Sequence, residues 1–277
     1  MTDQYAVIGN PVEHSLSPAI HAEFARAAGQ QLSYRRILAP LDGFRAAALK
    51  FRDEGGKGLN VTLPFKHEAW KLVEAHSGSA VDAGAVNTIA FQEGRIVGHN
   101  TDGIGLVRDL KENLGSPIRG RRLLLMGSGG ATYGVMEPLL RELPDSIVVA
   151  NRTLDKAVAL VGHFERLQKF AQRGITARPY SALAGARFDI VINATSAGLA
   201  DIMPPLPEDV FAPGALAYEI VYGRGTLFMK FALERGAKAA DGLGMLVEQA
   251  AESFFIWRGV RPATAPVIRA LRMKAEG

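Results

Sequence analysis

The chain has 277 residues, which at about 150 residues per domain leaves room for one large unit or two compact ones. With 48% hydrophobic and 22% charged residues, its composition is typical of a globular protein. The absence of cysteine excludes disulfides, thiolate metal sites and a cysteine nucleophile. The net charge of +4 comes from scattered basic residues, and no run of about 18 apolar residues occurs. We therefore expect a cytoplasmic protein that binds neither nucleic acid nor membrane.

The first hundred residues alternate β-rich runs with helical patterns. The expected strands are Tyr5–Gly9, Leu32–Leu38 and Gly58–Val61, and the expected helices are Pro18–Ala28, Gly43–Asp53 and Phe65–His76. This alternation favours parallel βαβ units. Two further runs, Val86–Phe91 and Arg95–Gly98, are joined through Gln-Glu-Gly and predict a β-hairpin.

A second series follows an expected helix at Asp102–Leu114. Its expected strands, each with a helix after it, are Arg122–Met126, Ser146–Ala150, Phe188–Asn193 and Ala215–Val221. Near-continuous apolar strands are typical of a parallel sheet covered on both faces. The C-terminal helices expected at Leu243–Arg258 and Ala263–Lys274 have no strand after them, so we expect them to pack onto the first unit.

The clearest ligand signal is the glycine-rich turn Gly127-Ser128-Gly129-Gly130-Ala131, placed between an expected strand and an expected helix. Glycines let the backbone approach a pyrophosphate, and the amides at a helix N-terminus face the anion. A glycine turn alone is equally common as a plain structural turn, so the flanking strand and helix carry the prediction.

The residues after the next expected strand indicate which dinucleotide binds. An acid there would accept hydrogen bonds from the ribose of NAD, but Asn151-Arg152-Thr153 contains none. Arg152 instead offers a planar cation that suits a 2′-phosphate, and Thr153 lies at an expected helix N-cap. An exposed arginine beside a cap is the alternative.

In the first unit, Ser15 and Ser17 precede Pro18 at an expected helix start. Two hydroxyls beside a helix N-terminus could hold a carboxylate. Capping by Ser17 is the simpler explanation, and it leaves Ser15 unexplained.

Lys66 lies just beyond the expected strand Gly58–Val61, where α/β sheets place ligands, and Asp102 starts the helix that leaves the first unit. Brought together, a lysine and an aspartate could transfer protons. A solvated lysine and a capping aspartate are the alternatives for these two residues. The six histidines show no metal-ligand spacing, so we expect no metal site, and His14 and His21 are interpreted as walls of the site or surface residues.

Together these motifs resemble the shikimate dehydrogenase family along essentially the whole chain. The matching segments are Gly9–Pro18, Gly58–Lys66, Ala85–Thr88, Asn100–Gly103, Gly127–Ala131, Asn151–Thr153, Asn193–Ser196 and Asp241–Ala250.

The resemblance implies an α/β fold with a cleft between an N-terminal α/β substrate domain, residues 1–101 completed by helices in 241–277, and an NADP-binding, Rossmann-like doubly wound parallel sheet, residues 102–240. It implies reversible, NADPH-dependent reduction of 3-dehydroshikimate to shikimate in aromatic amino-acid biosynthesis by a monomer or homodimer. Lys66 and Asp102 would be catalytic. The implied substrate residues are Ser15, Ser17, Thr62, Asn87, Tyr222 and Gln249. The implied cofactor residues are Gly127, Ser128, Gly129, Gly130, Ala131, Asn151, Arg152, Thr153, Thr195, Ile220, Gly242 and Met245.

The sequence departs from the family pattern near its nicotinamide side. Glu219 stands where the family has aspartate, and the loop from Tyr222 to Thr226 is about one residue short. Two alternatives remain at this stage: a quinate/shikimate dehydrogenase that accepts NAD, and a non-catalytic sensor that would keep the glycine turn but could dispense with the proton-transfer pair.

Overall fold

A computed structural model describes residues 2–167, 174–195 and 202–276 of the chain. They form two compact units, residues 1–105 with 246–277 and residues 106–245. The boundaries between them fall within two helices, α5 (Asp102–Arg108) and α9 (Leu243–Arg258). None of the described helices is long and apolar enough to cross a membrane.

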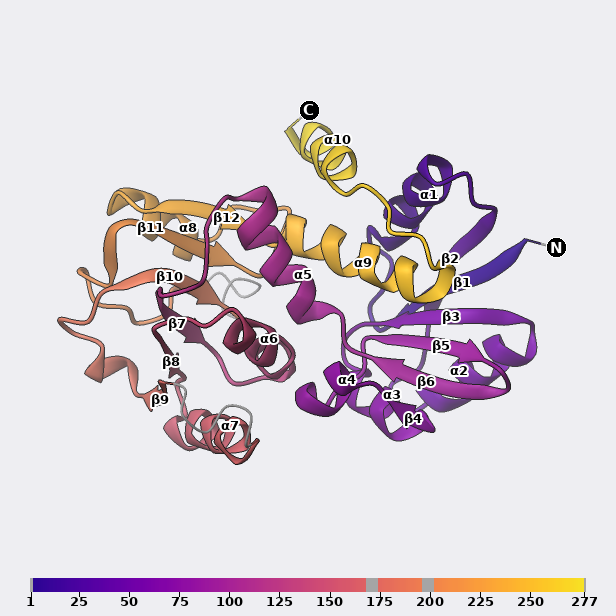
Figure 1. The fold of residues 1–277 in the computed structure, drawn as a ribbon, viewed down its shortest axis with the longest axis horizontal. Coiled ribbons are helices and arrows are strands. Elements are labelled where there is room, and N and C mark those ends of the chain that lie inside the picture. The colour runs from indigo at the N-terminus through magenta and orange to yellow at the C-terminus, as the bar shows by residue number, and fades with distance from the viewer. Residues whose placement is uncertain (1, 168–173, 196–201, 277) are drawn as a thin grey trace. The chain divides into compact units, whose positions relative to one another are not determined.

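The first unit is built on a mixed sheet in the order β2-β1-β3-β5-β6-β4 (Figure 1). Its elements in chain order are β1 (Asp3–Gly9), α1 (Ser17–Ala27), β2 (Leu32–Leu38), α2 (Phe44–Asp53), β3 (Gly56–Val61), α3 (Lys66–Leu72), β4 (Ala75–His76), α4 (Gly78–Ala83), β5 (Thr88–Gln92) and β6 (Arg95–His99). β1 pairs with β2 and β3 in parallel, whereas β5 and β6 pair antiparallel as the expected hairpin.

One expected helix of this unit is too long. The sequence predicts a helix from Phe65 to His76, but α3 ends at Leu72 and Val73 is extended. The N–H of Glu74 bonds to the carbonyl oxygen of Ile96, 2.9 Å away, and β4 then pairs with β6. Pairing with a neighbouring strand therefore overrides the local helical pattern.

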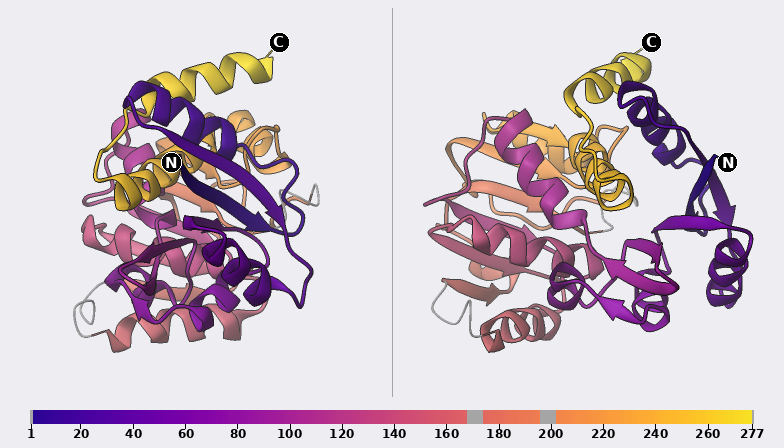
Figure 2. Two further views of the ribbon diagram at one scale, coloured as in Figure 1. Left: turned by 90° about the vertical axis from the view of Figure 1, so that its right-hand side faces the viewer. Right: turned by 45° about the vertical axis from the view of Figure 1, so that its right-hand side comes forward.

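Apolar side chains cover both sides of the first sheet. Ala6 and Ile8 of β1 pack with Phe44 and Phe51 of α2. Another cluster joins α1 to α9 and α10 (Ala265–Glu276), through Phe24, Phe254 and Ile268 among others. Figures 1 and 2 show α10 lying beside α1, as expected for C-terminal helices that pack onto the first unit.

The second unit is built on a six-stranded, wholly parallel sheet in the order β12-β11-β10-β7-β8-β9. Its elements are the π-helix Asp109–Asn113, β7 (Arg122–Met126), α6 (Gly130–Arg141), β8 (Ser146–Ala150), α7 (Leu154–Arg166), β9 (Ile175–Arg178), a 3-10 turn at Tyr180–Ala182, β10 (Phe188–Asn193), β11 (Phe211–Glu219), α8 (Leu227–Glu234) and β12 (Lys238–Asp241).

β7 shows why this sheet was predictable. Its four residues from Leu123 to Met126 are fully buried. Leu123 and Leu125 face the cluster that contains α6 and α7, while Leu124 and Met126 face the cluster that contains α8. Of the stretch between β10 and β11 the structure describes residues 194–195 and 202–210, which contain no helix, and the helix expected directly after β10 falls on residues outside the described part of the chain.

Candidate active site

The functional side chains of the first unit meet where β3 and β6 end and the antiparallel β5 begins. Lys66 is the first residue of α3, and its Nζ lies 2.6 Å from Asp102 Oδ2. The side chains are 21% and 10% exposed, so the pair is mostly shielded from water while Lys66 keeps an open side. The structure therefore brings together two residues that are 36 positions apart in the sequence.

Asn87 fixes the other side of Asp102. Its Nδ2 donates to Asp102 Oδ1, 2.8 Å away, and to Thr101 Oγ1, 3.0 Å away. The backbone N–H of Thr101 donates to Asn87 Oδ1 at 2.9 Å, which determines which end of the amide faces Asp102. Asp102 thus receives donors on both of its oxygens, which fixes the orientation of its carboxylate.

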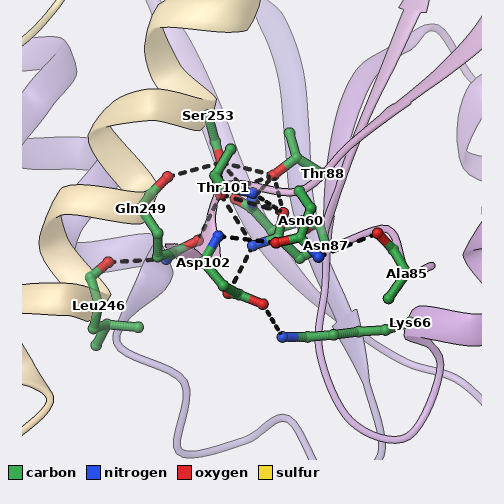
Figure 3. A network of polar contacts seen from close by, with 11 residues as sticks. Asn60, Lys66, Ala85, Asn87, Thr88, Thr101, Asp102, Leu246, Gln249 and Ser253 are labelled. Atoms are coloured by element: carbon green, nitrogen blue, oxygen red, sulfur yellow. Dashed lines mark hydrogen bonds and ion pairs between the residues drawn. The ribbon is translucent and has the colours of Figure 1, made fainter. Parts of the chain in front are cut away.

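Around this triad lies a network of neutral polar groups (Figure 3). Asn60 Nδ2 donates to Thr88 Oγ1 and Ser253 Oγ, at 3.1 and 2.9 Å. Thr101 Oγ1 donates to Gln249 Oε1, 3.3 Å away. The sequence motifs do not by themselves mark Asn60, Thr88, Thr101 and Ser253 as site residues. Asn60, Thr88 and Thr101 lie inside matching segments, whereas Ser253 carries no sequence signal except that it follows Gln249 by one helical turn.

The serine pair is arranged differently from the expectation. Leu16 is the N-cap of α1 and Ser17 is its first residue, so the interpretation of Ser17 as the capping residue is wrong. It is Ser15 whose Oγ accepts from the N–H of Ser17, at 3.3 Å. The two hydroxyl oxygens lie 3.2 Å apart, close enough to bind the two oxygens of one carboxylate.

His21 belongs to neither alternative proposed for it. Its ring is fully buried and stacks on Tyr34 at 4.3 Å, and neither ring nitrogen has a hydrogen-bond partner among the described residues. Burial lowers the pKa of His21 to about 3, so the imidazole is neutral at physiological pH. His14 is exposed, and Thr62 lies half-buried between β3 and α3.

In the second unit, the candidate cofactor residues gather at the C-terminal edge of the parallel sheet. Gly127 follows β7 with φ +106°, and a Cβ there would lie 3.0 Å from the carbonyl oxygen of Ala194. Gly129 is the N-cap of α6, so no side chain caps this helix, and its first turn contains no acid. These features leave the helix N-terminus suited to a phosphate.

The other cofactor candidates follow neighbouring strands. Asn151, Arg152 and Thr153 connect β8 to α7, and Arg152 is exposed. Thr153 occupies the N-cap position as expected, but its side chain makes no capping bond; instead Asn151 Nδ2 donates to the carbonyl oxygen of Thr153 at 2.8 Å. The remaining candidates follow β10, β11 and β12, and they are Thr195, Ile220, Gly242 and Met245. Tyr222 also belongs to this unit.

Within the described part of the chain, no group of three or more His, Asp or Glu side chains could hold a metal ion. A glycine turn that joins strand to helix at the edge of a doubly covered parallel sheet defines the second unit as a Rossmann-like, dinucleotide-binding type of fold.

Comparisons with known proteins agree with this class. Family models described as "Shikimate dehydrogenase substrate binding domain", "Shikimate / quinate 5-dehydrogenase" and "Shikimate 5'-dehydrogenase C-terminal domain" match residues 7–89, 109–203 and 242–272. The chain is 55% identical over 271 residues to the shikimate dehydrogenase (NADP(+)) of Methylobacillus flagellatus, covering 98% of this chain and 99% of that one.

Two solved structures are similar over nearly the full length. An Ael1 enzyme from Pseudomonas putida is 51% identical with a TM-score of 0.92, covering 98% of both chains. The shikimate 5-dehydrogenase of Thermus thermophilus, solved with NADP(H) and shikimate, is 34% identical with a TM-score of 0.87, covering 99% of this chain and all of that one. The chain belongs to the shikimate dehydrogenase family.

Proposed function

We propose that the protein catalyses the reversible, NADPH-dependent reduction of 3-dehydroshikimate to shikimate, a step of aromatic amino-acid biosynthesis. The observation that carries the proposal is the shielded Lys66–Asp102 pair at 2.6 Å, held by Asn87 in a chain of this family. A non-catalytic sensor has no proton to transfer, so it would not need an accessible lysine in contact with a carboxylate.

The first unit provides the groups for substrate. Ser15 and Ser17 would hold the carboxylate, and Thr62, Asn87, Asp102 and Gln249 would bind the ring hydroxyls. Tyr222 is proposed as a further substrate residue from the second unit. These neutral hydrogen-bonding groups and one lysine suit a small ligand that carries a carboxylate and several hydroxyl groups.

The second unit fits NADP. The uncapped N-terminus of α6 and the open backbone of Gly129 and Gly130 suit the pyrophosphate, because a Cβ at either glycine would meet no other described part of the chain within 4 Å, its chain neighbours and the backbone of α6 aside. Arg152 would bind the 2′-phosphate, with Asn151 and Thr153 beside it. Thr195, Ile220, Gly242 and Met245 would face the remainder of the cofactor. When bound, NADPH supplies a hydride to the carbonyl carbon of the substrate.

Lys66 would serve the substrate oxygen. As hydride reaches the carbonyl carbon, the C=O π electrons move to oxygen, and Lys66 Nζ donates the proton that completes the secondary alcohol. Asp102 orients the ammonium group and stabilises its charge before the transfer. Lys66 then regains a proton from solvent through its exposed side, and in the oxidative direction neutral Lys66 accepts the proton.

Initial rates with shikimate and quinate, each with NADP and NAD, test the proposal. The expected result is the largest kcat/KM for shikimate with NADP. Comparable rates with NAD or quinate would favour the broader quinate/shikimate activity instead. Binding of shikimate without any turnover would favour a sensor. Size-exclusion chromatography with light scattering would test the prediction of a monomer or homodimer, and cell fractionation the cytoplasmic location.

A further inference from the structure

Glu219, at the C-terminal end of β11, is a fully buried carboxylate in the second unit. Its Oε2 accepts from Asn193 Nδ2 at 2.8 Å and from Thr226 Oγ1 at 3.0 Å. Its Oε1 accepts from the N–H of Val221 at 3.3 Å. All three partners donate, so the arrangement suits a group that only accepts. Burial raises the pKa of Glu219, and these donors oppose that rise.

These contacts tie together two neighbouring segments. Asn193 Oδ1 accepts from Thr195 Oγ1, 2.7 Å away, so one amide links Thr195 to the carboxylate. Val221 and Thr226 lie at the two ends of the loop that follows β11, and Glu219 holds both ends. Thr226 is also the N-cap of α8, where its Oγ1 accepts from the N–H of Met229.

The middle of the same loop is held from β12. Asp241 Oδ2 accepts from the N–H of Gly223 at 3.2 Å. A Cβ at Gly242 would lie 2.0 Å from the carbonyl oxygen of Ile220. The backbone of the turn after β12 therefore packs closely against the start of the loop. The loop is therefore fixed at both ends and in the middle.

The order of the strands indicates which half of a dinucleotide this loop would face. The glycine turn follows β7 and Arg152 follows β8, on one side of the sheet centre. β10 and β11 lie on the other side of β7. Because the 2′-phosphate is expected at Arg152 and the pyrophosphate at the glycine turn, the cofactor extends from there towards β10 and β11, which places its nicotinamide half at these loops.

We propose that Glu219 is a positioning residue that holds Thr195 and the loop Ile220–Thr226 in the arrangement required by the nicotinamide half of NADP. The inference rests on the proposed function, since it assumes a bound dinucleotide. Glu219 itself is buried behind its partners, so its effect on the cofactor is exerted through the groups it holds.

Glu219→Gln gives the sharpest test. The amide replaces one acceptor oxygen with a donor, which must then face a donor of Asn193, Thr226 or Val221. Calorimetric titration would measure the Kd of NADP and of adenosine 2′,5′-bisphosphate, which carries the 2′-phosphate but lacks nicotinamide. We expect the Kd of NADP to rise at least about tenfold while that of the bisphosphate stays within about twofold. Glu234→Gln, an exposed acid on α8, is the matched control and should change neither.

A second pair of variants covers the case in which Glu219→Gln does not fold. Thr226→Val removes one donor to Glu219, whereas Thr226→Ser keeps it. The valine variant should weaken NADP binding selectively, and the serine variant should not.

Three results would overturn the inference: unchanged NADP binding in folded Glu219→Gln, equal losses for NADP and the bisphosphate, or identical behaviour of the two Thr226 variants. Failure of the wild-type protein to bind NADP would instead contradict the proposed function.

Discussion

The two units build their sites by different means. In the first unit, side chains bond to side chains: Lys66, Asp102, Asn87 and Thr101 are linked by contacts of 2.6 to 3.0 Å in a mostly buried setting. At the glycine turn of the second unit, the backbone itself forms the site, with positive φ at Gly127 and an N-terminus of α6 that no side chain caps.

This difference has a chemical reason. Proton transfer needs groups whose ionisation and direction are controlled, and buried donors and acceptors provide that control. Binding of a pyrophosphate needs several N–H groups and close approach, which side chains would obstruct. Substitutions of the proton-transfer pair in the first unit should therefore act mainly on turnover, and those at the cofactor residues of the second unit mainly on cofactor affinity.

The largest effect is expected at Lys66. Because its interaction with the substrate oxygen strengthens as charge develops, Lys66→Ala should lower kcat by about 10²–10⁴-fold and change substrate and cofactor Kd by less than about tenfold. Steady-state kinetics and binding titrations would measure this, with exposed Lys71→Ala on the same helix as control. Asp102→Asn should behave similarly, and the double variant should lose much less than the product of both effects. An unchanged kcat in folded Lys66→Ala would show that Lys66 takes no part in the proton transfer.

Arg152 offers the corresponding test in the second unit. A hydrogen bond to a charged group contributes about 1.5–3 kcal/mol, so Arg152→Ala should weaken NADP binding by roughly 10- to 150-fold. NAD, which lacks the 2′-phosphate, should bind nearly as before. Calorimetry with both cofactors measures the ratio, and Lys156→Ala on α7 is the control. Equal losses for both cofactors would show that Arg152 is structural.

The burial of His21 predicts that the first unit loses stability as the pH falls. Its pKa is about 3 in the folded protein and near 6.5 when unfolded, so below pH 6.5 the unfolded chain binds more protons. The free energy of unfolding should therefore fall by up to about 1.4 kcal/mol per pH unit between pH 6.5 and 3, and this part of the stability is complete above pH 6.5. Urea unfolding at several pH values, compared with His21→Phe, would isolate the contribution. The phenylalanine variant should show a flatter profile, while the exposed His67→Gln should match the wild type.

The smallest effect is expected at Ser15. Replacement by alanine removes one hydroxyl from the proposed carboxylate site, so KM for shikimate should rise about three- to tenfold, corresponding to about 1 kcal/mol. The Kd of NADP should stay unchanged. Because Ser15 Oγ also accepts from the N–H of Ser17, the melting temperature must be measured in parallel. A lower melting temperature with unaltered KM would assign Ser15 to the helix start alone.

Long apolar patterns made the sheets predictable, and short edge strands escaped prediction. β7 is a continuous apolar run, and its place at the centre of a covered sheet follows from that. β4, β9 and β12 have only two to four residues and lie at sheet edges, so their pairing depends on neighbours that local sequence does not reveal.

The residues of the candidate site also fall into a group that local sequence reveals and a group that depends on tertiary packing. Glycine turns and the residues beside them can be recognised locally, since backbone geometry restricts which residues fit. The contact between Lys66 and Asp102 depends on how α3 and α5 leave the sheet. The positions of the two residues in the sequence allowed a proton-transfer pair, and the resemblance to a family favoured it over a solvated lysine and a capping aspartate. Ser253 and Glu219 gain their importance from tertiary packing, because a lone serine on a helix or an acid at a strand end is common in any sequence.

Gly244 shows how little freedom one position can have. A Cβ built on it would lie 1.8 Å from Asp109 Oδ1, and Asp109 is itself 2% exposed and accepts from the hydroxyl of Tyr218 at 2.6 Å. Any side chain at position 244 must either displace this carboxylate from the tyrosine or separate the start of α9 from the π-helical turn. In a library of all single substitutions, position 244 should therefore tolerate no residue but glycine. Even alanine should destabilise the fold there, whereas much larger changes in side-chain size should be tolerated at exposed positions.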